Sequence, residues 1–222
     1  MINLLHRNYS HLTPRYIAAR LRLAAWEWKN PEAPWLTCAA VEILSSLLKS
    51  GDCGLEFGAG RSTLWFSSRV SRLTSIESDE NWYEKVKLAL ATRGFLNIDL
   101  RLASTPDICL ASVEDMPAES VDFVLVDGIV RVRDRCALLS LPKLKNNGIL
   151  IIDNVNWHLP SNSRSPNSRR LIDGPETTEW TLFAESVKNW RYIWTSDEVT
   201  DTAFFLKPAQ PSESPRPSSG WS

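Results

Sequence analysis

Hydrophobic and polar positions along the chain form a repeat of strands and helices. Short apolar runs predict five strands, at residues 53–57, 73–78, 97–103, 121–128 and 148–154. Helical patterns follow the first, second and fourth of these runs, at 62–70, 79–94 and 131–145. The clearest helix covers 79–94, with an acidic start at Asp79 and a stop at Gly94. Apolar strands that alternate with helices are typical of a parallel sheet covered on both faces.

The pattern changes at both ends of this repeat. Two helices are predicted before it, at 13–29 and 36–49. The face of the first helix that we expect to pack on the domain is formed by Ile17, Leu21, Ala24, Ala25 and Trp28. After the repeat comes a long polar segment, 155–175, of a length typical of binding loops or disorder, and then one helix and two strands that suit an antiparallel pair.

Together, these elements predict an α/β fold with a doubly wound, Rossmann-like sheet. We expect about seven strands, mostly parallel with an antiparallel last strand, and additional N-terminal helices. Residues 1–50 would form a helical extension packed on the core, and residues 51–207 the main domain. Residues 208–222 are rich in proline and serine, which predicts a disordered tail.

Composition narrows the class of protein. Lys and Arg number 25 and Asp and Glu 26, so the net charge of -1 gives no reason to expect a nucleic-acid partner. The four cysteines are scattered without a CxxC pair, which favours reduced thiols in the cytoplasm over disulfides or zinc. The first residues lack an apolar region long enough for a signal peptide, and no run of about 18 apolar residues occurs, so we expect neither secretion nor a transmembrane segment.

The stretch "CGLEFGAGRST" at 53–63 carries the first candidate chemistry. A strand that ends in Gly58 and Gly60 and leads into a helix lets a ligand approach bare backbone. A dinucleotide site needs a third glycine where this chain has Thr63. Glu56 would face the ligand, repelling a pyrophosphate and attracting a cation, and Glu77 ends the next strand, where an acid can bind a ribose. Each feature alone is more often a turn or a solvated strand end, but together they describe a nucleoside with a cationic tail.

Four motifs, "LEFGAGRST", "SIESDENWYEKV", "VDFVLVDG" and "NGILIIDN", resemble those of the class I S-adenosylmethionine-dependent methyltransferases over residues 53–154. In particular, the chain resembles bacterial members without assigned substrates. The resemblance implies S-adenosylmethionine bound over the strand ends of a sheet with a reversed last strand. The cofactor-binding residues that it implies are Glu56, Phe57, Gly58, Ala59, Gly60, Ser62, Thr63, Glu77, Ser78 and Asp127.

The fourth and fifth strands end in "VDG" and "IDN", which places Asp127, Asp153 and Asn154 at the carboxyl edge of the sheet. This set also resembles the cation-dependent catechol and caffeoyl-coenzyme A O-methyltransferases, which implies a divalent cation such as magnesium as a further cofactor. The basic residue that those enzymes carry three positions after the first Asp is Val130 here, with Arg131 next to it. Alternatively, Asp153 and Asn154 only cap the following loop.

His158 follows in the long loop and is a candidate proton acceptor, although loop histidines are more often exposed to solvent. Asp127, Asp153, Asn154 and His158 are therefore the catalytic candidates. We predict a cytoplasmic methyltransferase that acts on oxygen of a small molecule or glycan. The alternatives are a nicotinamide-dependent oxidoreductase, against which the missing glycine speaks, and a non-catalytic binding module of the same fold. The sequence does not name the acceptor or the oligomeric state.

Overall fold

The computed structural model describes residues 12–128 and 132–209. Val130, Arg131 and all but the first two residues of the proline-rich tail lie outside this part. The strands are β1 (Cys53–Phe57), β2 (Arg72–Glu77), β3 (Ile98–Leu102), β4 (Val121–Val126), β5 (Leu144–Asp153), β6 (Arg191–Ser196) and β7 (Asp201–Leu206). The helices are α2 (Pro14–Lys29), α3 (Cys38–Leu47), α4 (Arg61–Ser67), α5 (Glu80–Arg93), α6 (Pro106–Glu114), α7 (Arg133–Ser140) and α8 (Thr178–Val187).

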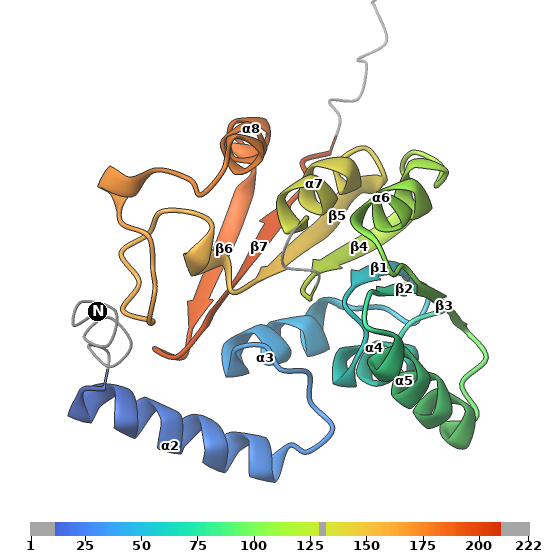
Figure 1. Cartoon of the computed structure of the whole chain (residues 1–222), viewed down its shortest axis with the longest axis horizontal. Helices are drawn as coiled ribbons and strands as arrows, with labels where there is room; N and C mark the ends of the chain where they lie inside the picture. The colour runs from blue at the N-terminus through green and yellow to red at the C-terminus, as the bar shows by residue number, and fades with distance from the viewer. Residues whose placement is uncertain (1–11, 129–131, 210–222) are drawn as a thin grey trace, which may run out of the picture.

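The seven strands form one sheet in the order β3-β2-β1-β4-β5-β7-β6 (Figure 1). β7 runs antiparallel to both of its neighbours, whereas the remaining pairs are parallel. The predicted doubly wound sheet with a reversed last strand is confirmed. The strand order reverses between β1 and β4, and ligands of such sheets bind outside the strand ends at this point.

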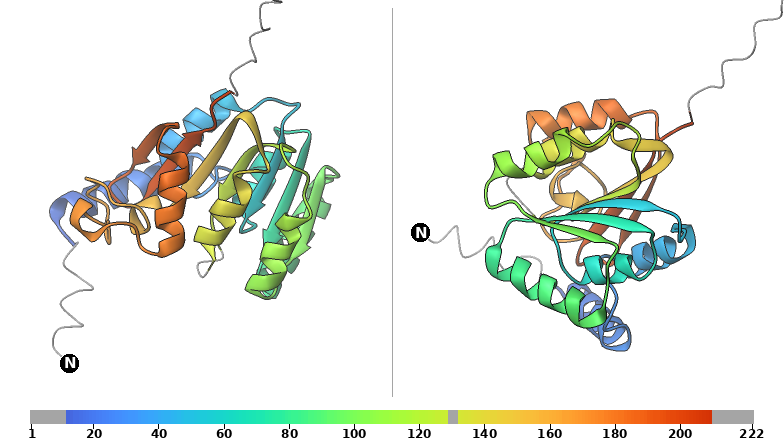
Figure 2. Two further views of the ribbon diagram at one scale, coloured as in Figure 1. Left: turned by 90° about the horizontal axis from the view of Figure 1, so that it is seen from above. Right: turned by 90° about the vertical axis from the view of Figure 1, so that its right-hand side faces the viewer.

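Helices cover both faces of the sheet, with α6, α7 and α8 on one side and α2 to α5 on the other (Figure 2). On the first side, Trp180 and Phe183 of α8 join Cys136 of α7 and Cys109 of α6 in one buried cluster. On the other side, Leu44 of α3 packs with residues of α4 and of the central strands. Each central strand is therefore buried on both faces, which explains why β1, β4 and the second half of β5 are apolar at nearly every position.

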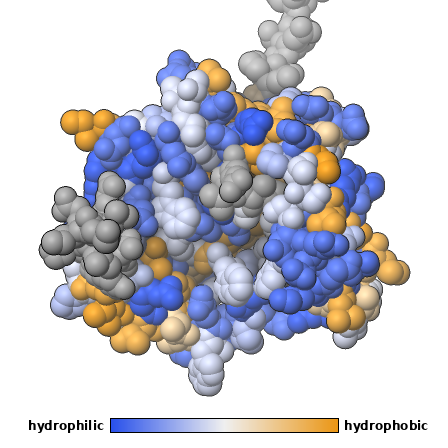
Figure 3. Space-filling model, viewed as in Figure 1, coloured by the Kyte–Doolittle hydropathy of each residue, from blue (hydrophilic) through white to orange (hydrophobic). Residues whose placement is uncertain are grey.

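Helix α2 begins as the sequence predicts, because the Thr13 hydroxyl accepts a hydrogen bond from the Tyr16 backbone amide. The predicted packing face is wrong, however. Ala19 and Leu23 are buried, whereas Leu21 and Trp28 are 66% and 81% exposed. Apolar side chains accordingly gather at the surface over this helix, at the lower left of Figure 3. The buried face of the helix is thus the one that carries Ala19 and Leu23, and other large apolar side chains lie on the exposed face.

The segment 155–175 is folded back on the domain rather than extended into solvent. It contains two short 3-10 helices, η1 (Val155–Trp157) and η2 (Leu171–Asp173). The Asn156 side chain is buried and donates to the backbone carbonyl of Pro166 and to the hydroxyl of Ser168. Ser165 in turn donates to Asp201 at the start of β7, with 2.6 Å between the oxygens. These buried polar contacts fix a segment that its composition marks as a loop.

The four cysteines are free thiols, in agreement with the sequence analysis. None of the helices in the described part of the chain is long and apolar enough to cross a membrane.

Candidate active site

The glycine loop after β1 passes against the loop after β4. Gly58 has a φ of +92°, and a Cβ atom placed on it would lie 2.9 Å from the backbone of Asp127 and Gly128. Gly128 has a φ of +57°, and a Cβ atom there would lie 2.7 Å from the Cα of Gly58. Both glycines are therefore required, because side chains would strain the backbone and separate the two loops. The sequence analysis identified Gly58 but missed Gly128, which stands in "VDG" next to the candidate Asp127.

The Glu77 carboxylate holds the same loop from the end of β2. One of its oxygens accepts the backbone N–H of Ala59, 2.9 Å away. The other accepts the backbone N–H groups of Ser78 and Asp79, at 2.7 Å and 2.8 Å. This carboxylate thus fixes the glycine loop against the start of α5. Glu77 also lines a cavity beside this loop.

Glu56 lies beneath the glycine loop and not in front of it. Its side chain is fully buried, and one carboxylate oxygen accepts hydrogen bonds from the hydroxyls of Thr63 and Ser75, at 2.6 Å and 2.8 Å. Burial raises the pKa of Glu56 to about 7, although the hydroxyls of Ser62, Thr63 and Ser75 oppose the shift. The expectation that Glu56 faces the ligand directly is therefore wrong, because the first turn of α4 covers it.

A cavity of about 250 Å³ opens between the glycine loop and α5. It brings together six of the ten cofactor residues expected from sequence, namely Gly58, Ala59, Gly60, Ser62, Glu77 and Asp127. Glu56, Phe57, Thr63 and Ser78 do not line it. Phe57 and Thr63 are buried under the loop and support it, since the backbone carbonyl of Phe57 accepts the N–H of Asp127.

Four residues line this cavity that sequence reasoning missed: Trp35, Arg61, Trp82 and Gly128. The Trp82 indole N–H donates to the backbone carbonyl of Ala59 at 2.5 Å, and its ring stacks on Trp35 with centroids 6.5 Å apart. Arg61 lies over the Trp35 ring and donates to the backbone carbonyl of Pro31. Along the chain, Trp82 stands at helical spacing with Val86 and Leu90, which indicates packing, so nothing in the sequence marked it as a cavity wall.

Asp127 is joined to the end of β5 through a buried arginine, Arg133. The guanidinium donates to the Asp127 carboxylate at 2.9 Å, and the same carboxylate oxygen accepts the backbone N–H of Gly128. Arg133 also donates to the Gly128 backbone carbonyl at 2.6 Å. At β5 it contacts the backbone carbonyl of Asp153 and the side-chain oxygen of Asn154, at 3.2 Å and 3.3 Å. This arginine begins α7 and is two residues beyond Arg131.

The three candidate metal ligands already have protein partners: Asp127 and Asn154 bind Arg133, and Asp153 binds Thr202. Asp153 is buried and its carboxylate accepts a hydrogen bond from Thr202 of β7 at 2.8 Å. Burial, with a smaller contribution from the nearby Asp127 charge, raises the pKa of Asp153. Asn154, with a φ of 52°, donates to Thr200 and directs its oxygen to Arg133. Among the described residues, no group of three or more His, Cys, Asp or Glu side chains is arranged to hold a metal ion.

His158 is buried, so the expectation of a solvent-exposed loop histidine is wrong. Its Nδ1 lies 2.5 Å from a carboxylate oxygen of Glu176, and its ring stacks on Trp180 with centroids 4.9 Å apart. Its Nε2 is buried and accepts or donates no hydrogen bond to the described residues. Burial lowers the pKa of His158, and the Glu176 carboxylate opposes this shift. The contact with Glu176 joins the two ends of the 155–175 segment.

No protein-family model and no curated protein matches this chain. Solved structures of methyltransferases, however, share its architecture. The O-methyltransferase TomG from Streptomyces achromogenes, solved with S-adenosylmethionine, is 17% identical, with a TM-score of 0.55 over 88% of this chain and 90% of that chain. A candidate caffeoyl-CoA O-methyltransferase from Staphylococcus aureus is 19% identical, with a TM-score of 0.55 over 92% and 98%. A methyltransferase from Geobacter sulfurreducens is 15% identical, with a TM-score of 0.55 over 93% and 96%. The fold is that of the S-adenosylmethionine-dependent methyltransferases.

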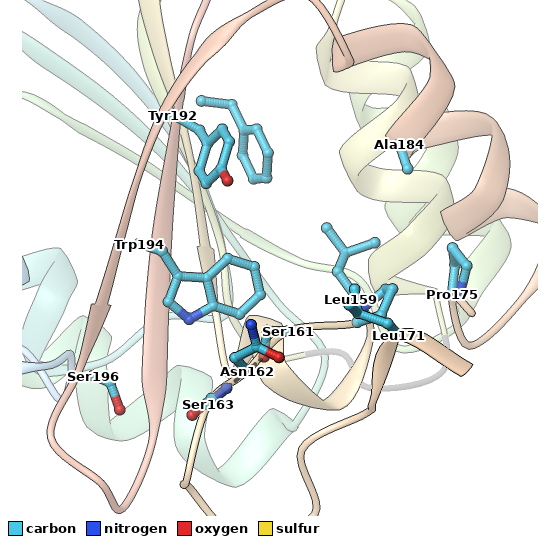
Figure 4. Close-up of a pocket in the computed structure, with 12 residues that line it drawn as sticks. Leu159, Ser161, Asn162, Ser163, Leu171, Pro175, Ala184, Tyr192, Trp194 and Ser196 are labelled. Carbon is cyan, nitrogen blue, oxygen red and sulfur yellow. Dashed lines mark hydrogen bonds between the residues drawn. The ribbon is translucent and has the colours of Figure 1, made fainter. Parts of the chain in front are cut away.

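A second, larger cavity of about 570 Å³ lies at the β6 edge of this methyltransferase fold. Figure 4 shows Tyr192 and Trp194 of β6 facing Leu159, Leu171 and Pro175 of the 155–175 segment across the cavity. Hydroxyl and amide groups of Ser161, Ser163, Ser196 and Asn162 also line it. The cavity therefore combines aromatic and aliphatic walls with hydrogen-bonding groups.

Proposed function

We propose that this protein is an S-adenosylmethionine-dependent methyltransferase that transfers a methyl group to an oxygen of a small molecule or glycan. The observation that carries the proposal is the cavity at the strand ends, where the bare backbone of Gly58 and Gly60, the Glu77 carboxylate and Asp127 meet. This cavity lies where the strand order reverses, which is the binding position of doubly wound sheets. The fold shared with TomG, which was solved with this cofactor, supports the choice of ligand.

In this proposal, the glycine loop binds the amino-acid part of the cofactor and Glu77 binds the ribose hydroxyls. Glu77 already accepts three backbone N–H groups, but each carboxylate oxygen can accept more than one hydrogen bond. Trp82 and Trp35 supply an aromatic wall beside the same cavity. The Glu77 and Asp127 carboxylates in this cavity suit a ligand that carries an ammonium and a ribose.

Methyl transfer is an in-line displacement, in which the bond from methyl carbon to sulfonium sulfur breaks as the bond to the acceptor oxygen forms. S-adenosylhomocysteine leaves, and the acceptor hydroxyl loses its proton to a base. Asp127 suits this role because its side chain is 31% exposed beside the cavity and only one of its oxygens is engaged by the described residues. His158 stays a candidate that would need movement of the 155–175 segment, since its Nε2 is buried.

We assign the non-reacting part of the acceptor to the cavity between β6 and the 155–175 segment. Most of its lining residues come from this segment, whose length is typical of binding loops. The rings of Tyr192 and Trp194 offer flat apolar surfaces for an aromatic group or a sugar ring. Replacing Trp194 by Ala should therefore raise the KM for the acceptor while leaving S-adenosylhomocysteine affinity unchanged.

Calorimetric titration with S-adenosylhomocysteine tests the function directly. We expect the intact protein to bind and Gly60→Val to lose binding, because valine would fill the cavity beside Trp82. Gly51→Val is the matched control, since a side chain at Gly51 meets no atom within 4 Å. Absence of binding by the intact protein would reject the proposal, and thermal stabilisation by NAD alone would favour the oxidoreductase. Binding without methylated product in any acceptor screen would favour a binding module.

A further inference from the structure

The Arg133 guanidinium lies where the sequence pattern placed a metal ion. It donates four hydrogen bonds, to the Asp127 carboxylate, the Gly128 carbonyl, the Asp153 carbonyl and the Asn154 side-chain oxygen. We propose that this internal cation takes the place of a divalent metal, so that Arg133 is a positioning residue for Asp127 and methyl transfer needs no added cation. The role in methyl transfer rests on the proposed function, whereas the exclusion of metal does not.

The donor set fits a guanidinium better than a divalent cation. A divalent cation would need oxygens from Asp127, Asp153 and Asn154 at one point. Here one oxygen of the Asp153 carboxylate accepts a hydrogen bond from Thr202, and one oxygen each of Asp127 and Asn154 accepts from Arg133. A divalent ion bound to these two oxygens would lie next to a fixed positive charge that is almost fully buried, with 6% of its side chain exposed. Repulsion between two cations at such a separation is strong away from bulk water.

Arginine is the residue type that can replace a metal at this position. Its planar group has five N–H donors in a fixed fork, so one side chain can bind oxygens that lie in different directions. The four hydrogen bonds that Arg133 donates connect the loop after β4 with the end of β5. Lysine would supply the same charge without the fork. The contacts of Arg133 fix one oxygen of Asp127 and leave the other for the cofactor or acceptor.

The test is a Mn²⁺ titration of the intact protein followed by electron paramagnetic resonance, in which bound Mn²⁺ loses the signal of the free ion. We expect the wild-type protein to leave the signal as it is in buffer. Mn²⁺ binding that disappears in Asn154→Ala would overturn the proposal. This arm uses the wild-type protein and needs no acceptor, so it tests the exclusion of metal even if an arginine variant does not fold.

The second arm measures S-adenosylhomocysteine affinity in Arg133→Met and Arg133→Lys, with urea unfolding to verify that each variant is folded. We expect a loss of about tenfold or more in the Met variant and a smaller loss in the Lys variant, which keeps the charge. Arg135→Met, an exposed position on the same helix, should bind like wild type. Equal losses in the Met and Lys variants would overturn the positioning role. Failure of the wild-type protein to bind S-adenosylhomocysteine would instead reject the proposed function.

Discussion

At the scale of single residues, the site depends on side chains that are absent as much as on those that are present. Gly58 and Gly128 allow two loops to touch, and Arg133 then fastens the second loop to β5. Gly60 differs from both, because its φ of 175° is ordinary extended backbone and an added Cβ atom would meet Trp82 only at 3.6 Å. The two glycines of the motif therefore have separate functions. Gly58 is required by the fold and Gly60 keeps the cavity open.

This difference predicts losses of stability of different size for two alanine substitutions. Gly58→Ala should destabilise the protein by about 1–3 kcal/mol or more, because alanine would adopt a strained φ and contact Gly128. Gly60→Ala should cost less than about 1 kcal/mol, since only the helix N-cap changes. Urea unfolding at one pH measures both. Equal losses would show that the contact between the two loops does not determine the stability at Gly58.

The buried Glu56 predicts a specific pH dependence of stability. Its pKa rises from 4.5 to about 7 in the folded protein, so between these values the folded state holds a proton that the unfolded state has lost. Stability should therefore fall as the pH rises through this window and then level off, with a total contribution of about 3 kcal/mol. Glu56→Gln should remove this contribution, because glutamine does not ionise.

The measurement compares the free energy of unfolding of wild type and Glu56→Gln at pH 5 and pH 8. Asp153 also has a raised pKa, but it is present in both proteins and cancels in the comparison. Glu42→Gln is the control, because Glu42 is exposed on α3. If wild type and Glu56→Gln lose the same stability between the two pH values, Glu56 is ionised in the folded state at pH 5.

At the scale of elements, α5 is both a packing helix and a wall of the candidate site. Val86 and Leu90 are buried against the sheet, while Trp82, one turn earlier, contacts the glycine loop. The helix starts where the Asp79 carboxylate accepts the N–H of Trp82, and Glu77 accepts the N–H of Asp79. The end of β2 therefore sets the position of α5, and α5 sets the width of the cavity.

Replacing Trp82 by Phe should weaken S-adenosylhomocysteine binding by about five- to tenfold, because the hydrogen bond to the Ala59 carbonyl is lost and the loop is held less firmly. Phenylalanine keeps an aromatic ring at this partly buried position, so the global stability should change little. Trp28→Phe is the control, since Trp28 is 81% exposed on α2. Calorimetry of the three proteins measures the effect. Unchanged affinity in the Trp82 variant would remove this helix from the site.

At the scale of the whole molecule, helix α3 and the residues before it are part of a core that they share with the sheet. Leu36, Ala40 and Leu44 belong to the same buried cluster as Phe123 and Phe204 of the sheet. The Thr37 hydroxyl also contacts that of Thr195 in β6. Helix α3 therefore covers one face of the strands and joins the first part of the chain to the last.

This packing predicts that Leu44→Ala destabilises the protein by about 2–5 kcal/mol, the usual cost of a cavity at a fully buried leucine. Leu47→Ala on the same helix should cost less than about 1 kcal/mol, because Leu47 is 38% exposed. Urea unfolding compares the two variants. A small loss at Leu44 would mean that the N-terminal helices are separable from the methyltransferase fold.

The sequence by itself determined the order and type of most elements, because a strand buried on both faces must be apolar and helices must start and end at capping residues such as Asp79 and Gly94. It also located the glycine loop, Glu77 and Asp127, whose residue types follow from their positions at strand ends. It missed α6, a short helix that begins at Pro106 in a stretch where apolar and polar residues are mixed.

Only the tertiary structure decided which side chains meet. It buried Glu56 and His158, exposed Leu21 of α2, and brought Trp82 to the glycine loop from a separate helix. It also placed Arg133, six residues beyond Asp127, between the oxygens assigned to a metal. These outcomes depend on contacts between segments far apart in the chain, and a pattern along one segment holds no information about which neighbour faces it.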